Sequence, residues 1–269
     1  MEASPPALHS SFPITVEPAP DLPGYNVYRP RDLGAIGGRL PVVVWANGGC
    51  VRHDATWKTL LARWAAAGFF VVAITSPPDG EATIEDRTTA ADQAKAIDWA
   101  TEQDARAGGP FAALLDLDRV AAAGNSCGGI TSLALAGDDA RVRAVFVLSG
   151  SSVGPNATRE QAAAVMKKVT VPVGFAVGGP EDIASSQADQ DFDLLASGIP
   201  GFVAKRASGD HITVSTDVEI LADVAEIGVN WIDYALTGNE TARRSLLDRP
   251  SPSSPPDAWT VRAKHLDVR

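Results

Sequence analysis

Continuous apolar segments, each about as long as a β-strand, constrain the fold of this chain more than any other feature. Residues 40–46 form such a run, which is typical of a strand buried on both faces of a parallel sheet. Similar segments recur and alternate with stretches of helical periodicity. The expected strands are residues 40–46, 69–74, 119–123, 144–148, 171–177 and 202–205. The expected helices are residues 57–68, 88–107, 129–136, 161–168, 181–196 and 217–236. This alternation predicts a single α/β domain, with a mostly parallel sheet and helices on both faces.

The length of 269 residues suits one sizeable core rather than two large domains. We expect residues 1–40 to form an N-terminal extension with the first short strands, and residues 41–248 to form the α/β core. Residues 249–269 begin with a Pro/Ser-rich linker. The tail that follows carries Trp259, Val261 and Leu266, which are enough apolar side chains to pack on the core.

Charge and composition exclude several classes of partner. The 33 acidic and 23 basic residues give a net charge of −10, which argues against binding to nucleic-acid phosphates. No run of 18 apolar residues is present, so we expect no membrane span. The two cysteines and four histidines are widely scattered, so we expect no metal site. The localisation stays open, because a missing signal peptide favours the cytoplasm whereas a disulfide would favour export. The oligomeric state also stays open.

The segment Gly124-Asn125-Ser126-Cys127-Gly128 matches the G-x-S-x-G pattern of a nucleophile on a sharp strand-to-helix turn. It follows an expected strand and leads directly into an expected helix. A hydroxyl at that position gains from the helix dipole and from unpaired N–H groups. The sequence therefore predicts Ser126 as a nucleophile.

A second match, Gly150-Ser151-Ser152-Val153-Gly154, also follows an expected strand. It continues into Pro155-Asn156, which does not extend as a helix. Ser152 is therefore the weaker candidate.

A serine nucleophile of this kind needs a histidine later in the chain, oriented by a carboxylate that lies between the two. His211 and His265 are the two histidines after Ser126, and His211 follows the short strand expected at 202–205. We prefer His211, because His265 lies in the tail. The strand before it ends in Gly178-Gly179-Pro180-Glu181-Asp182. We expect Asp182 to orient the imidazole, with Glu181 as the substitute acid.

A tetrahedral intermediate also needs two N–H donors for its oxyanion. One donor is expected at Cys127, directly after the nucleophile, and the other in the loop Asn47-Gly48-Gly49-Cys50. Gly49 and Cys50 are both candidates for this second donor. Because Cys50 and Cys127 fall in the two segments that would build this hole, they form either a disulfide or a pair of buried free thiols, and both alternatives stay open.

These motifs resemble those of the α/β-hydrolase superfamily over residues 40–238. Within it, the chain is similar to compact esterases of the dienelactone-hydrolase and cutinase/polyesterase type. The resemblance is carried by four segments: residues 47–50, 96–100, 126–129 and 179–183. It implies a Ser-Asp-His triad, no cofactor, and hydrolysis of carboxylic esters through an acyl-enzyme.

Two departures from that resemblance affect the expected site. Many relatives carry histidine where Asn47 stands, and dienelactone hydrolases use cysteine where this chain has Ser126. The short segment between residues 148 and 171 leaves room for a small flap but not for a large lid. An open site of this kind suits short-acyl or polymeric esters. Asn47, His53 and Trp57 are expected near the substrate cleft.

The sequence therefore predicts a serine hydrolase that acts on carboxylic esters. Polyesters, lactones and amides are alternative substrates for the same triad. A non-catalytic binding protein with this fold and an interaction module are alternatives from other classes.

Overall fold

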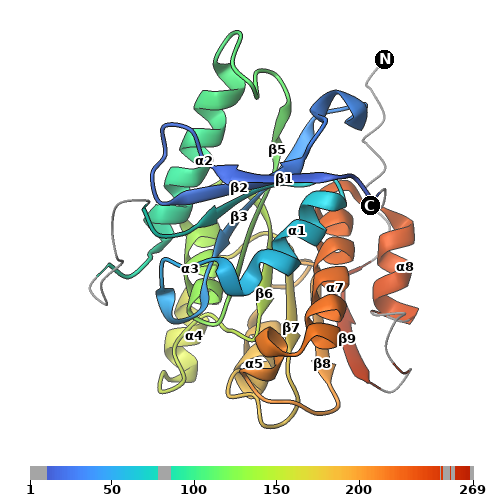
Figure 1. Ribbon diagram of the computed structural model, residues 1–269. Helices are drawn as coiled ribbons and strands as arrows, with labels where there is room; N and C mark the ends of the chain where they lie inside the picture. The colour runs from blue at the N-terminus through green and yellow to red at the C-terminus, as the bar shows by residue number, and fades with distance from the viewer. Residues whose placement is uncertain (1–10, 78–85, 249, 251–254, 256–257, 267–269) are drawn as a thin grey trace.

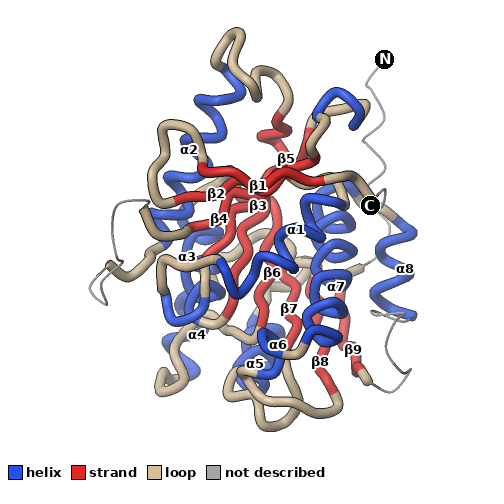
Figure 2. Tube along the Cα trace, in the orientation of Figure 1, coloured by secondary structure: helices blue, strands red, loops and turns tan. Residues whose placement is uncertain are grey.

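The computed structural model describes residues 11–77, 86–248, 250, 255 and 258–266. A nine-stranded sheet, ordered β1-β2-β4-β3-β5-β6-β7-β8-β9, runs through the middle of the molecule (Figures 1 and 2). Its strands are β1 (Ile14–Pro18), β2 (Tyr25–Pro30), β3 (Leu40–Ala46), β4 (Phe70–Ile74), β5 (Leu115–Asn125), β6 (Val142–Leu148), β7 (Val173–Val177), β8 (Gly201–Arg206) and β9 (Trp259–Lys264). The strands from β4 to β8 are parallel, and the antiparallel strands β1, β2 and β9 lie at the two sides.

Helices cover both faces of this sheet. The helices are α1 (Lys58–Ala66), α2 (Ala90–Ala105), α3 (Cys127–Asp138), α4 (Arg159–Met166), α5 (Ser185–Leu194), α6 (Thr213–Thr216), α7 (Val218–Thr237) and α8 (Glu240–Asp248). One apolar core lies between the sheet and α1, α7 and α8, and the other lies between the sheet and α2, α3, α4 and α5. The prediction of a single α/β domain with a mostly parallel sheet is confirmed. Among the described residues, none of the helices is long and apolar enough to cross a membrane.

Several elements differ from the sequence prediction at places where polar residues obscure the pattern. Strand β5 starts at Leu115 rather than at residue 119, and its register against β3 shifts between Pro41 and Val42. The polar side chains of Asp116, Asp118 and Arg119 hide this first half. Helix α8 was not predicted; the Asn239 side chain caps its start by accepting hydrogen bonds from two backbone N–H groups.

The two ends of the chain contribute to the same sheet as its centre. Strands β1 and β2 come from the region expected to hold the N-terminal extension and the first short strands; β1 pairs with β2, and β2 pairs with β4. The tail, expected only to pack on the core, forms β9 and pairs antiparallel with β8 along its length. Most of the Pro/Ser-rich stretch expected as a linker lies outside the described residues.

A tryptophan packs tightly against a glycine where α1 crosses α7. Trp64 is fully buried, and its indole N–H donates to the carbonyl of Ala225. A Cβ at Gly228 would lie 2.6 Å from the Trp64 ring, closer than packed atoms approach. Glycine at position 228 is therefore what lets the two helices meet.

Gly228→Ala is expected to lower the free energy of unfolding by about 1–3 kcal/mol through overpacking. Helix propensity alone would favour alanine by about 1 kcal/mol, so a fall in Tm would isolate the packing contact. Gly154→Ala is the control, because a Cβ there has no neighbour within 4 Å. Thermal melting followed by circular dichroism should show Tm falling by several degrees for Gly228→Ala alone. Equal Tm values for the two variants would contradict this account.

Candidate active site

Ser126 lies at a sharp turn between β5 and α3, at the carboxyl edge of the parallel strands. Its backbone has φ 51° and ψ −115°, a conformation that L-residues rarely adopt and that costs about 1–3 kcal/mol. Close backbone packing encloses this turn. A Cβ at Gly128 would lie 2.0 Å from the Ala46 carbonyl oxygen, and one at Gly124 would lie 2.4 Å from the Gly128 carbonyl. Both positions therefore require glycine, and the turn presents the serine hydroxyl above the sheet.

Three predicted residues from three different strand ends meet at this turn. His211 Nε2 lies 2.9 Å from Ser126 Oγ, and His211 Nδ1 lies 2.8 Å from Asp182 Oδ1. With the ring proton on Nδ1, the imidazole donates to the carboxylate and accepts from the hydroxyl. This arrangement can remove the serine proton as Oγ attacks an electrophilic carbon.

The Asp182 carboxylate is buried and held by backbone donors. Only 3% of the residue is exposed. Oδ2 accepts from Gly178 N–H at 2.8 Å, and Oδ1 accepts from Ala184 N–H at 2.9 Å. Burial alone would raise the pKa of Asp182, but His211, these backbone donors and the Ser149 side chain hold that pKa below its ordinary value. The group therefore stays ionised and can stabilise an imidazolium.

The alternative acid is exposed to solvent, and the alternative base lies in a different part of the sheet. Glu181 is exposed to solvent beside Asp182. His265 follows Lys264, which pairs with Gly201 at the start of β8, so it lies near the sheet edge opposite the triad.

The second serine motif is occupied by a different contact. Ser152 is buried, and its hydroxyl donates to Asp191 Oδ1 at 2.7 Å rather than to an imidazole. Ser126 is the serine that the fold brings to His211.

The expected oxyanion donors lie on two segments that are joined covalently. The turn η2 (Gly48–Cys50) follows β3, and both Gly49 (φ 62°) and Cys50 (φ 54°) have left-handed backbones. A disulfide connects Cys50 to Cys127, with the Cα atoms 5.2 Å apart. Cys127 is the first residue of α3, so its N–H has no acceptor within the helix. The bridge thus holds the turn after β3 against the helix that starts at the nucleophile.

Asn47 does not lie in the cleft as predicted but supports this turn from inside. The side chain is buried, where it accepts from Trp45 Nε1 at 2.9 Å and donates to the carbonyls of Val51 and Ile74 at 3.1 and 2.7 Å. These bonds use both amide N–H groups, and the side chain is 1% exposed, so it is not available as a donor to a substrate. Asn47 therefore fixes the path of the chain between Ala46 and Val51.

Trp57, which was also expected near the cleft, lies in the apolar core. Its ring is buried against Trp45, with centroids 5.4 Å apart. The cause is Asp54, a buried carboxylate that the sequence analysis missed. It accepts hydrogen bonds from Asn26, Tyr28 and Thr75, and it holds this segment against the sheet so that Trp57 turns into the core. His53 is exposed to solvent just before it.

Reduction of the Cys50–Cys127 bridge should slow covalent labelling of Ser126 by a fluorophosphonate by about tenfold. Loss of a single oxyanion donor costs about 10²–10³ in rate, and a loosened donor turn loses part of that. The measurement compares labelling rates before and after reduction by a phosphine, with the thiols then blocked. The double variant Cys50→Ala/Cys127→Ala is the matched control without a blocking group. Unchanged labelling of the fully reduced protein would contradict the role given to the bridge.

Comparison with known proteins adds a family assignment to this geometry. Residues 24–191 match the model of the family described as X-Pro dipeptidyl-peptidase (S15 family), which covers more than half of the chain and includes Ser126 and Asp182. The comparison with curated proteins gave no match. The family supports the α/β-hydrolase fold, whereas the finer resemblance to dienelactone hydrolases and cutinases stays a prediction. The chain belongs to the S15 family of serine hydrolases.

Proposed function

We propose that this protein hydrolyses carboxylic esters through an acyl-enzyme on Ser126. The observation that carries the proposal is the continuous hydrogen-bonded series Ser126–His211–Asp182, with distances of 2.9 and 2.8 Å. Asp182 orients the imidazole, and the N–H of Cys127 together with one from Gly49 or Cys50 stabilises the oxyanion.

The reaction follows from this geometry in two stages. Ser126 Oγ attacks the ester carbon while its proton passes to His211 Nε2, and the resulting imidazolium is stabilised by Asp182. The imidazolium then protonates the leaving alcohol as the C–O bond breaks, which leaves an ester on Ser126. A water molecule gives its proton to His211 and attacks that ester. The imidazolium finally returns the proton to Ser126 Oγ as the acid departs.

Exposed aliphatic side chains beside the triad support an accessible ester substrate. Ile183 follows Asp182, Ile212 follows His211, and Val51 follows Cys50, with exposures of 61%, 60% and 52%. We call these three residues the apolar rim. Residues 149–172, which connect β6 to β7, contain only the short helix α4. An open site with an apolar rim favours short-acyl esters or the exposed chains of a polymeric ester, in line with the resemblance to cutinases and polyesterases.

A second candidate function is release of X-Pro dipeptides from the N-terminus of a peptide, which the family match favours. The same triad can attack an amide, but a dipeptidyl-peptidase must also recognise a free N-terminal ammonium. The exposed carboxylate nearest in sequence to His211 is Asp210, whose Oδ1 already accepts from Ile212 N–H, Thr213 N–H and the Thr213 hydroxyl. Because one oxygen of this carboxylate is engaged within its own turn and the residues of the rim are apolar, we place ester hydrolysis first.

A fluorophosphonate should add one adduct to the folded protein, on Ser126, as shown by intact mass and peptide mapping. Ser126→Ala should remove the adduct and lower turnover of p-nitrophenyl butyrate by several orders of magnitude, because triad members act as a unit. Ser152→Ala should still be labelled, which separates the two motifs. If folded wild-type protein gives no adduct, the result contradicts the proposed hydrolase and favours a non-catalytic binding protein.

A substrate panel separates the two candidate functions. We expect turnover of p-nitrophenyl acetate, butyrate and hexanoate, and little release of p-nitroaniline from Ala-Pro-p-nitroanilide. Efficient release from the peptide substrate, with slow ester turnover, would favour the dipeptidyl-peptidase.

Ile183→Ser and Ile212→Ser test the apolar rim. Each should lower the ratio of kcat/KM for hexanoate to kcat/KM for acetate by about 3–10-fold, since each buried methylene contributes about 0.8 kcal/mol. Leu247→Ser on α8 is the matched control, because it removes an exposed aliphatic side chain in a different part of the chain. An unchanged ratio in both rim variants would remove the rim from substrate binding.

A further inference from the structure

The turn at residues 149–154, between β6 and α4, contacts the nucleophile. Ser126 N–H donates to the carbonyl of Leu148, the last residue of β6, at 2.9 Å. Gly150 packs on the backbone of Ser126, where a Cβ would lie 2.9 Å from the Ser126 carbonyl oxygen and 3.1 Å from its nitrogen. A shift of this turn would therefore move Ser126.

The same turn is bonded to the strand that leads to the catalytic acid. Ser149 has a left-handed backbone (φ 41°), and its N–H donates to the carbonyl of Ala176 on β7 at 2.8 Å. Two residues further along the chain, Gly178 N–H donates to Asp182 Oδ2 at 2.8 Å. One short segment thus packs on the backbone of Ser126 and is bonded to the strand that positions a donor to Asp182.

Helix α5 holds this turn through a buried carboxylate. Asp191 is fully buried, and Ser152 is 1% exposed. Asp191 accepts from Ser152 N–H at 2.5 Å and from the Ser152 hydroxyl at 2.7 Å. Gln187, one turn earlier on α5, donates to the carbonyl of Gly154 at 3.1 Å. Because α5 begins just after Asp182, the helix links the acid to the turn under the nucleophile.

Burial raises the pKa of Asp191 to about 6, although both Ser152 bonds oppose that rise. Because the folded protein retains a proton that the unfolded chain has already lost, the contribution of this group to stability falls as pH rises towards 6. Above that pH the ionised carboxylate is held, at an electrostatic cost, in the place where it accepts both Ser152 bonds.

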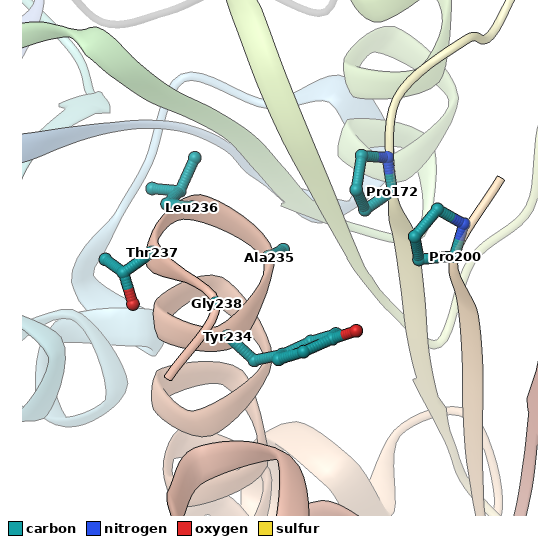
Figure 3. A pocket seen from close by; sticks show the side chains of 7 residues that line it. All are labelled: Pro172, Pro200, Tyr234, Ala235, Leu236, Thr237 and Gly238. Atoms are coloured by element: carbon teal, nitrogen blue, oxygen red, sulfur yellow. The ribbon is translucent and has the colours of Figure 1, made fainter. Parts of the chain in front are cut away.

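The cavity shown in Figure 3 lies in another part of the molecule. It has a volume of about 270 Å³ and is lined by Pro172, Pro200 and residues 234–238, next to the amino ends of β7 and β8. It is therefore at the edge of the sheet opposite the triad and does not explain the buried Asp191–Ser152 pair.

We propose that Asp191 and Ser152 are positioning residues for the triad. Their two hydrogen bonds fix the turn at residues 149–154, and that turn sets the positions of Ser126 and Asp182. Neither residue contacts substrate. The inference rests on the proposed function, because it concerns the same triad.

Three variants separate hydrogen bonding from charge and from packing. Asp191→Ala removes both bonds to Ser152. Ser152→Ala removes the hydroxyl bond and keeps the backbone bond. Asp191→Asn keeps both, because the amide oxygen accepts from Ser152 N–H while the amide nitrogen donates to the hydroxyl oxygen. Asp193→Ala is the matched control. Asp193 is an exposed acid on the same helix, and its carboxylate forms an ion pair with Arg262.

We expect kcat for p-nitrophenyl butyrate to fall about tenfold or more in Asp191→Ala, with KM within about twofold of wild type. Ser152→Ala should lie between this variant and wild type. Asp191→Asn should restore kcat to within about threefold, with Tm at pH 8 equal to or above that of wild type. Asp193→Ala should match wild type. The rate of fluorophosphonate labelling should follow the same order, which gives a readout that does not depend on the chosen ester.

Wild-type kcat and labelling in folded Asp191→Ala would overturn the inference, and so would equal losses in Asp191→Asn and Asp191→Ala. If Asp191→Ala does not fold, Ser152→Ala decides, and wild-type kcat in that variant overturns the inference. Failure of the proposed function is seen separately, in a wild-type protein that neither labels nor turns over any ester.

Discussion

The close approach of α3 to the end of β3 is the constraint on which the rest of this site depends. Gly128 lies so near Ala46 that any side chain there would collide with the β3 backbone at 2.0 Å. That contact brings the start of α3 beside the end of β3. Ser126 then lies half-buried above the sheet, and Cys127 lies within disulfide distance of Cys50. The elbow, the oxyanion turn and the bridge are therefore consequences of one backbone contact.

The fold class and the three triad residues follow from local patterns in the sequence. Strands such as β3 are buried on both faces and appear as apolar runs, and Ser126, Asp182 and His211 each follow such a strand. Parallel strands bring their carboxyl ends to one edge, so chain order and spacing were enough to predict which residues meet. The first half of β5 was missed because its charged residues interrupt the run. Strand β9 was missed although Trp259–Lys264 alternates apolar and polar residues, because the run is short and follows a Pro/Ser-rich stretch.

Side-chain direction near the motifs could not be predicted in the same way. Asn47 and Trp57 are close in sequence to the oxyanion turn, which suggested a cleft. Their positions instead depend on distant partners: the Ile74 carbonyl for Asn47, and the Trp45 ring for Trp57. The Asp191–Ser152 contact joins residues 39 positions apart and has no local signature. Long-range hydrogen bonds to buried polar groups are thus the part of this site that only the structure reveals.

The two sides of the nucleophile are held by different kinds of interaction, and the local backbone explains why. On the oxyanion side, Gly49 and Cys50 adopt left-handed conformations in a short turn with little apolar side chain to pack, so a covalent bridge supplies the restraint. On the acid side, the turn at residues 149–154 packs on the buried face of α5, where Asp191 is shielded from water. There a single carboxylate that accepts two hydrogen bonds supplies the restraint. The apolar rim proposed to meet the substrate is instead exposed to solvent. The restraints described above therefore lie beneath the nucleophile, and in the proposed function the rim, rather than the reacting groups, sets the preference among substrates.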